Sequence, residues 1–354
     1  MDLRIVADNF KKELELSKSG KKTSLPFIRH RISSEPIVKD GETFQVIVIG
    51  GTIFRKALVK KDDKNIVIVE KEEKYQPAFK NKNDFDKFIE KEISAKVANV
   101  ALNFAYPLKP VFKNGKLDGV LISGTKENVF DDLVGEEVGA EVEKMILKTR
   151  KQEIKVSVAN DTICLLLAGL TRFSWEELAG GVIGTGMNFA FFLNEDEIVN
   201  LESGNFDKFP RTPEAQIIDS YSTNKGKGIF EKEVAGAYLY KHFNLINEAK
   251  AFNTPSLRST QELDQIAQQN GTKEAEVAKS LLSNSASLVA AQIAGIMEFQ
   301  KKDLTFVVEG SLFWLANGYR AQVKKTLDEI CPKYKAKFVK IADSTILGAA
   351  KLIA

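Results

Sequence analysis

The chain has 354 residues, and at roughly 150 residues per domain this length predicts about two domains. Hydrophobic residues make up 44% and charged residues 28%, which excludes a disordered chain and allows a sizeable core. Lys and Arg total 51 against 48 Asp and Glu, and the resulting net charge of +3 is too balanced for a protein that coats nucleic acid. With two cysteines and two histidines, a disulfide framework, a Cys-rich metal site and His-based zinc or triad chemistry are not expected.

The first half of the chain predicts strands mixed with helices. In chain order, we expect a helix at 3–19, strands at 44–49, 53–59 and 65–69, a helix at 83–97, a strand at 99–104, a helix at 135–148, a strand at 154–159 and a helix at 161–170. The three strands between 44 and 69 form a meander, because glycines at 50–51 and charged residues at 62–64 mark its turns.

The second half of the chain continues this pattern. We expect strands at 181–183 and 187–193, helices at 228–248, 260–268 and 273–301, and then strand 304–308, helix 319–330, strand 337–341 and helix 345–353. Strands that alternate with helices indicate the α/β class. No apolar leader follows Met1, and the most apolar stretch, 163–170, is far too short to span a bilayer. We therefore expect a soluble, cytoplasmic protein with no membrane partner.

Two glycine-rich stretches resemble each other, VIGGTIF at 48–54 and VIGTGMNF at 182–189, about one domain length apart. Glycines between two strands let backbone N–H groups approach an anion, and the Thr hydroxyl adds a donor. For either turn alone, a tight hairpin without a ligand is the better explanation. The presence of both favours a nucleotide cleft between two domains. Neither stretch fits GxxxxGK[ST], which excludes a P-loop.

Two acidic residues are candidates for chemistry. Asp161 stands between Asn160 and Thr162, where a predicted strand meets a predicted helix. There it serves either as part of an ordinary helix cap or as a carboxylate that projects from a strand end and takes a hydroxyl proton. Glu231 lies in the first turns of a predicted helix beside a half-apolar face, where an acid is favourable even without a ligand. From the residues alone, both interpretations of each acid stand.

A series of motifs in order along nearly the whole chain resembles the hexokinase family of ATP-dependent sugar kinases. TSLPFI at 23–28 is similar to the lead-in SSLKMLPTF, VIGGTIFR at 48–55 to the first phosphate motif DLGGTNFR, LNFAYP at 102–107 to the sugar motif FTFSFP, and TK at 125–126 to TKGF. VANDT at 158–162 is similar to VVNDT, IGTGMNFA at 183–190 to VGTGTNA, and NLESG at 200–204 to NTEWG. NKGKGIFEKEVAGAYL at 224–239 is similar to NPGKQ..FEKMISGMYL, and VEGSLF at 308–313 to the adenosine motif VDGSLY. Each motif is weak alone, and their shared order and spacing carry the resemblance.

The resemblance implies an α/β, two-domain, actin-like (ribonuclease H-like) sugar kinase fold with a cleft between the domains. It implies transfer of the ATP γ-phosphate to the 6-hydroxyl of a hexose such as glucose, with Asp161 as the general base. The other sugar hydroxyls would be held by Thr125, Lys126, Asn160, Asn188, Glu202 and Glu231, which suits a hexose because these groups both donate and accept.

The resemblance also implies a nucleotide site. The phosphates would be cradled by Gly50, Gly51, Thr52, Arg55, Gly184, Thr185 and Gly186, and the nucleoside side would be approached by Gly310, Ser311 and Gly348. Mg²⁺ would be bound through the ATP phosphates, and no residue is assigned as a protein ligand of the metal.

Several positions depart from the family's pattern. The acid of the first phosphate motif, which helps to organise Mg²⁺ in this fold, is Val48, and the Asn of that motif is Ile53. The Ser of the sugar motif is Ala105, the Asp of the adenosine motif is Glu309, and the family's DGSGKGAA is DSTILGAA at 343–350. The sugar half is nearly complete, whereas the nucleotide and metal half is eroded. Alternatives are therefore a weakened homologue that binds or senses sugar, or a kinase with another phosphoryl donor; the retained Asp161 favours an enzyme.

The predicted small domain comprises residues 36–160 and is completed by 344–354. The predicted large domain comprises 161–343, with the N-terminal segment 1–35 packed on it. Closure of the domains on the sugar would exclude water, which otherwise competes as the phosphoryl acceptor.

Overall fold

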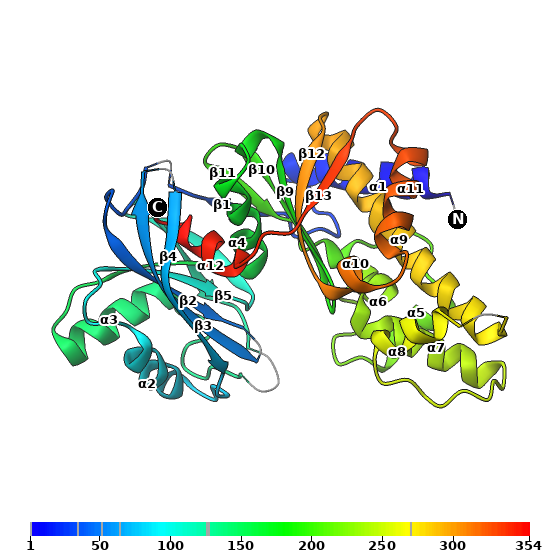
Figure 1. Cartoon of the computed structure of the whole chain (residues 1–354), viewed down its shortest axis with the longest axis horizontal. Helices are drawn as coiled ribbons and strands as arrows, with labels where there is room; N and C mark the ends of the chain where they lie inside the picture. Colours follow the sequence, from blue (N-terminus) through cyan, green and yellow to red (C-terminus); the bar gives the residue numbers. More distant parts are fainter. Residues whose placement is uncertain (1, 34, 51, 64, 125–127, 270) are drawn as a thin grey trace. The chain divides into compact units, whose positions relative to one another are not determined.

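The structure is a computed structural model that describes residues 2–33, 35–50, 52–63, 65–124, 128–269 and 271–354 (Figure 1). The chain divides into two compact units. Unit 1 comprises Met1–Phe27, Gly181–Phe189 and Leu201–Lys340, and unit 2 comprises Ile28–Gly180, Ala190–Asn200 and Ile341–Ala354. The predicted domain boundary falls between Asn160 and Asp161, which both lie in unit 2.

Unit 2 is built on a five-stranded sheet in the order β4-β3-β2-β5-β8. Its strands are β2 Thr43–Ile49, β3 Ile53–Asp62, β4 Asn65–Tyr75, β5 Asn99–Phe104 and β8 Lys155–Ala159. The first three form the predicted antiparallel meander, and β2, β5 and β8 run parallel. The carboxyl ends of these parallel strands share one edge of the sheet, which is where ligands bind in open α/β sheets. Gly50, Ala105 and Asn160 follow the strands at this edge.

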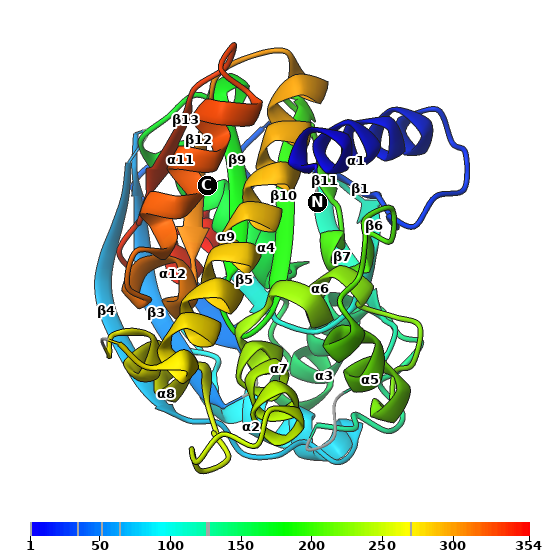
Figure 2. The same cartoon turned by 90° about the vertical axis from the view of Figure 1, so that its right-hand side faces the viewer.

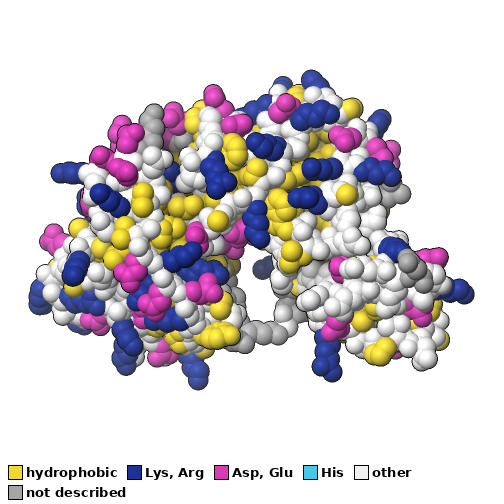
Figure 3. All heavy atoms as spheres, in the orientation of Figure 1, with side chains coloured by type: hydrophobic (Ala, Val, Ile, Leu, Met, Phe, Trp, Pro, Cys, Tyr) yellow, Lys and Arg dark blue, Asp and Glu magenta, His cyan; other side chains and the backbone are white. Residues whose placement is uncertain are grey.

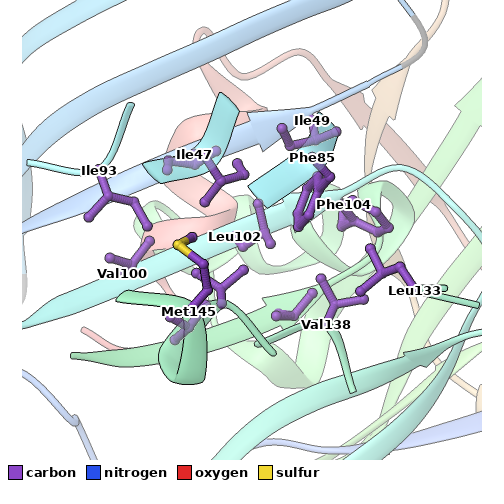
Figure 4. Close-up of a cluster of buried hydrophobic side chains, with 14 of the residues drawn as sticks. Ile47, Ile49, Phe85, Ile93, Val100, Leu102, Phe104, Leu133, Val138 and Met145 are labelled. Carbon is purple, nitrogen blue, oxygen red and sulfur yellow. The ribbon is translucent and has the colours of Figure 1, made fainter. Parts of the chain in front are cut away.

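One face of this sheet carries a core of aromatic and aliphatic side chains (Figure 4). Side chains alternate along a strand, so Ile47 and Ile49 of β2 share a face with Leu102 and Phe104 of β5. This core also takes in residues of α2 Lys82–Glu92 and α3 Val138–Arg150. Phe85 of α2 meets Phe104 edge-on, with ring centroids 5.9 Å apart.

The other face of the sheet is covered by the C-terminal helix α12 Ser344–Ala350, which packs on β2, on β5 and on α4 Asp161–Ala168. A Cβ added to Gly348 would lie 1.7 Å from the carbonyl oxygen of Cys164 in α4. Glycine at 348 therefore permits the close approach of the two helices, which is a packing reason for a residue predicted at the nucleoside side.

Unit 2 also contains short strands that the sequence did not predict. β6 Leu108–Lys113 and β7 Lys116–Leu121 form a hairpin, and β1 Ile28–Arg31 pairs antiparallel with β11 Glu197–Asn200. β11 in turn pairs with residues of β10 Met187–Asn194. Four to six residues with mixed polarity give too little periodicity for a strand to be recognised.

Unit 1 is organised around the long helix α9 Lys273–Gln300, on which α1 Leu3–Lys18, α8 Thr260–Ala267 and α11 Tyr319–Ile330 pack (Figure 2). Its other helices are α5 Pro213–Tyr221, α6 Ile229–Val234, α7 Gly236–Ala249 and α10 Ser311–Leu315. β12 Leu304–Glu309 runs parallel to β13 Ala336–Val339, and β9 Leu178–Ile183 and β10 each begin or end in this unit. By length and composition α9 passes for a membrane span, but 78% of its most apolar window is buried, so it is a core helix.

Two predicted helices are wrong in extent. The helix predicted at 83–97 ends at Glu92, because Ile93 turns extended and the Ser94 N–H donates to the Gln45 side chain at 2.8 Å. The helix predicted at 228–248 is two helices, α6 and α7, separated by Ala235 in an extended conformation. The break lets the first N–H groups of α7 bind another segment, as described below.

Charged side chains of both signs are interspersed on the face shown in Figure 3. This mixture agrees with the balanced composition of the chain.

Candidate active site

The second glycine turn, at the start of β10 in unit 1, is held by the N-terminus of α7. The Gly236 N–H donates to the Gly184 carbonyl at 2.8 Å, and the Ala237 N–H to the Thr185 carbonyl at 3.1 Å. In a trans peptide the C=O and N–H groups point in opposite directions. The N–H groups of Thr185 and Gly186 therefore point away from α7. Two backbone donors aimed to one side form the kind of concavity that binds phosphate.

Gly310 follows β12 and lies directly against this turn. A Cβ on Gly184 would be 3.0 Å from the Gly310 Cα. Gly310 itself has φ +122°, and a Cβ there would be 2.0 Å from the Ile183 carbonyl oxygen. Only glycine tolerates both the conformation and the contact. The structure thus brings together Gly184, Thr185, Gly186, Gly310 and Ser311, all predicted to face the nucleotide.

Glu231 lies beside the same turn, and two glycines make room for it. Its Oε2 accepts a 3.1 Å hydrogen bond from the Met187 N–H. A Cβ on Gly186 would be 3.1 Å from Oε2, and a Cβ on Gly204 would be 3.0 Å from the Glu231 Cβ. Burial raises the pKa of the Glu231 carboxyl, while the Met187 N–H and the Lys232 charge lower it, with a net rise. A partly desolvated carboxylate of this kind is a strong acceptor for a ligand hydroxyl.

Asn188 and Glu202 stand in the same part of unit 1. The Asn188 Oδ1 accepts from the N–H groups of Phe189 at 2.8 Å and Ser203 at 3.2 Å, which turns the oxygen end of the amide toward the backbone. Glu202 has φ +50°, in the left-handed region. For a residue other than glycine this conformation costs about 1–2 kcal/mol, and such strain concentrates at functional sites.

Asn205 connects these elements and was not predicted. Its Oδ1 accepts from the Gly228 N–H at 3.0 Å, and its Nδ2 donates to the Glu202 carbonyl at 3.1 Å. It therefore joins the backbone of Glu202 to the segment that leads into α6 and Glu231. The sequence offered no signal for this role, because Asn is frequent in turns for local reasons.

In unit 2, Asp161 is the first residue of α4, directly after β8. Asn160 is the N-cap, and its Oδ1 accepts from the Ile163 N–H at 3.0 Å. The helix cap and the candidate carboxylate are therefore different residues. Asn160 caps the helix, and the Asp161 side chain is exposed. Desolvation by nearby protein raises the pKa of the Asp161 carboxyl, more than hydrogen bonds from Thr162 lower it. A raised pKa suits a carboxylate that takes a proton.

The first glycine turn, after β2 in unit 2, has a different environment. The Gly50 carbonyl accepts from the Gln76 side chain at 2.7 Å and from the Tyr106 hydroxyl at 2.8 Å. Val48 is 4% exposed and lies opposite Asn103 of β5. The Asn103 Oδ1 is buried without a hydrogen-bond partner in the described structure. Position 48, where the family's motif has an acid, is therefore occupied by a buried apolar side chain.

The remaining predicted phosphate residues of unit 2 are less informative. Thr52 is exposed, and the Arg55 Nε donates to Glu73 at 2.6 Å across β3 and β4. Gly51, Thr125 and Lys126 lie outside the described residues. Among the residues that the structure describes, no group of three or more His, Cys, Asp and Glu side chains is arranged to hold a metal ion.

Comparisons with known proteins place this geometry in context. Two family models, each described as hexokinase, match residues 1–171 and residues 178–249 with 254–354. Hexokinase-7 of Oryza sativa subsp. japonica is 25% identical over an alignment of 393 positions that covers 88% of this chain and 84% of that protein. Hexokinase-9 of the same organism is 31% identical over an alignment of 157 positions that covers 40% of this chain and 30% of that protein. The chain thus spans less than a third of one of these relatives and most of the other.

Among solved structures, a hexokinase from Schistosoma mansoni complexed with glucose superimposes with a TM-score of 0.80 at 19% identity, over 99% of this chain and 94% of that one. This likeness confirms the predicted α/β, actin-like fold.

Proposed function

The chain belongs to the hexokinase family, and we propose that it is a sugar kinase that transfers the γ-phosphate of ATP to the 6-hydroxyl of a hexose such as glucose. The observation that carries the proposal is the constellation in unit 1 beside a glycine turn. Backbone N–H groups hold the side chains of Glu231 and Asn188, and the Asn205 side chain holds the main-chain carbonyl of Glu202. Carboxylates and an amide in one place suit a ligand with several hydroxyls. Thr125, Lys126 and Asn160 would complete the sugar contacts, as the family resemblance implies.

Asp161 is the proposed general base. Its carboxylate would accept the proton of the sugar 6-hydroxyl as that oxygen bonds to the γ-phosphorus. The bond between the γ-phosphorus and the bridging oxygen of ATP breaks, and ADP leaves. The exposed position at the start of α4 and the raised pKa of Asp161 support this role. Proton transfer of this kind typically contributes about 10²–10⁴-fold to the rate.

The turn at Gly184–Gly186 and the adjoining Gly310 and Ser311 would hold the nucleotide, through backbone N–H groups that point away from α7. Val48 provides no oxygen, so the protein does not fit a metal bound by an acid at that position. Mg²⁺ carried on the ATP phosphates would neutralise their charge, as it does in other kinases. We place the reaction in the cytoplasm and expect hexose and ATP as partners, not nucleic acid or membrane.

The apolar side chain at position 48 also raises the alternative of a sugar-binding homologue with weakened transfer. The test is a coupled assay of ADP release over a panel of hexoses with Mg-ATP, with reactions lacking sugar as the control. We expect ADP release that depends on a hexose. If sugars bind but no hexose stimulates ADP release from Mg-ATP, and no hexose is phosphorylated with other phosphoryl donors, the kinase proposal is wrong and the sugar-binding alternative stands.

A further inference from the structure

Glu231 lies on α6, a helix of only six residues. A helix this short is not stable by itself, so its orientation depends on what holds it in place. α6 begins after Gly228, which has φ +60°, and ends at the extended Ala235. The direction of the Glu231 side chain is therefore set by the contacts of its neighbours.

The next residue, Lys232, makes the strongest of these contacts. Its side chain is 0% exposed, and its ammonium donates to Asp219 Oδ1 at 2.6 Å, to the Ser222 hydroxyl at 2.9 Å and to the Asn224 carbonyl at 3.0 Å. All three donors of the ammonium group are thus used. A buried lysine is costly unless paired in this way.

Asp219, in α5, is the centre of a small charge cluster. Besides Lys232, it accepts from the Gly226 N–H at 3.0 Å and lies 3.4 Å from the Arg211 guanidinium. Burial alone would raise the pKa of the Asp219 carboxyl, but the hydrogen bonds from Lys232 and Gly226, with the two positive charges, lower it below its usual value. The carboxylate therefore stays ionised and ties α5 to α6.

Together these bonds fix the segment 222–228, exposed at 223–227, that leads into α6. Lys232 binds the start of the segment through Ser222 and Asn224, and Asp219 binds its middle through Gly226. At its end, the Gly228 N–H donates to Asn205, which donates to the Glu202 carbonyl. These hydrogen bonds, joined by the chain between Gly226 and Gly228, connect the Lys232–Asp219 pair to the backbone of Glu202. Glu231 is the chain neighbour of Lys232 and is held through it.

We propose that Lys232 and Asp219 are positioning residues that fix Glu231, and its placement relative to Glu202, for binding the sugar. This inference rests on the proposed function. An ion pair buried in this way adds little stability over apolar side chains of similar size. Its use here is to hold a polar segment in one geometry.

The test replaces the pair with apolar side chains of similar size, Lys232→Met with Asp219→Leu, and titrates the protein with glucose in the absence of nucleotide. We expect the melting temperature to change little and the Kd for glucose to rise about tenfold or more, as for loss of a charged hydrogen bond. In kinetics, KM should rise for glucose and stay unchanged for ATP. Lys227→Met, at an exposed lysine of the same segment, is the matched control and should bind glucose like the parent.

Ser222→Ala is a milder variant that removes one of the three acceptors of the Lys232 ammonium and leaves Asp219 in place, and it should raise the Kd by about threefold. It decides the question if the double variant does not fold. Parent-like affinity in a folded double variant, or in Ser222→Ala when the double variant is unfolded, overturns the positioning role and leaves the proposed function standing. If the parent protein itself binds no hexose, the proposed function fails and this inference fails with it.

Discussion

The two glycine turns are similar in sequence but are held by different groups. In unit 1, the carbonyls of Gly184 and Thr185 are bound by backbone N–H groups of α7, and Glu231 lies beside the turn. In unit 2, the carbonyl of Gly50 is bound by two side chains, and the preceding strand ends in apolar residues. The turn of unit 1 is thus surrounded by polar groups, whereas the turn of unit 2 lacks the acid that the family's motif carries.

This difference indicates where each part of the proposed reaction resides. The carboxylates proposed to bind the sugar and the better-supported phosphate turn belong to unit 1. Unit 2 contributes Asp161 at the carboxyl end of its parallel strands. An exposed acid with a raised pKa at this edge of the sheet favours a catalytic role for unit 2, because perturbed pKa values cluster at functional sites.

The largest expected effect is that of Asp161→Asn on turnover. The variant keeps the shape of the side chain but cannot accept the hydroxyl proton, so kcat should fall by about 10²–10⁴-fold. The affinity for glucose without nucleotide should stay close to that of the parent, because Asn160 still caps α4. Steady-state kinetics together with a sugar titration check this prediction; an unchanged kcat removes Asp161 from the mechanism.

A smaller effect is expected from the acids of unit 1. Glu231→Ala and Glu202→Ala should each weaken glucose binding by about 10–150-fold, because a hydrogen bond to a charged group contributes about 1.5–3 kcal/mol. Glu248→Ala, at an exposed acid of α7, is the control and should bind glucose normally. Calorimetric titration of the three variants is the measurement. Parent-like binding by both Glu231→Ala and Glu202→Ala would place the sugar site elsewhere.

Two substitutions restore the family's first phosphate motif in unit 2, where its acid and its Asn are missing. Val48→Asp with Ile53→Asn should raise kcat/KM for Mg-ATP by about tenfold, the worth of one charged contact, and leave glucose affinity unchanged. The melting temperature should fall, because Val48 is 4% exposed and an unpaired buried acid costs several kcal/mol. Val48→Asn with Ile53→Asn, which adds polarity without charge, is the control. A stable double variant with no gain in activity would argue against a latent Mg-ATP site.

The smallest effect at neutral pH concerns protonation. The pKa values of Asp161 and Glu231 are both raised, mainly because nearby protein desolvates the two carboxyl groups. In the proposed reaction both groups act as carboxylates, so the acid limb of kcat/KM for the sugar should begin above the ordinary Asp and Glu values of about 3.9 and 4.3. Below these pKa values, activity should fall about tenfold per pH unit for each group that must be ionised. A profile that stays flat down to pH 4 would contradict the raised pKa values.

The order and spacing of motifs predicted the fold class, and the meander at residues 43–75 followed from its turn residues. The break between α6 and α7 could not be predicted, because Ala235 is a good helix former and its extended conformation reflects the contact of α7 with the Gly184 turn. For the same reason the roles of Asn205 and Lys232 were missed. Asn205 and Gly228 are 23 residues apart and Lys232 and Asp219 are 13 residues apart, and no local pattern encodes either contact.

The central claim is that unit 1 contains a built sugar site even though position 48 has lost its acid. Calorimetric titration of the unmodified protein with glucose and other hexoses, without nucleotide, tests it most directly. We predict saturable binding of a hexose at one site per chain, and loss of this binding in Glu231→Ala. Absence of binding for every hexose tested, in a protein that is folded by its melting curve, would contradict the claim.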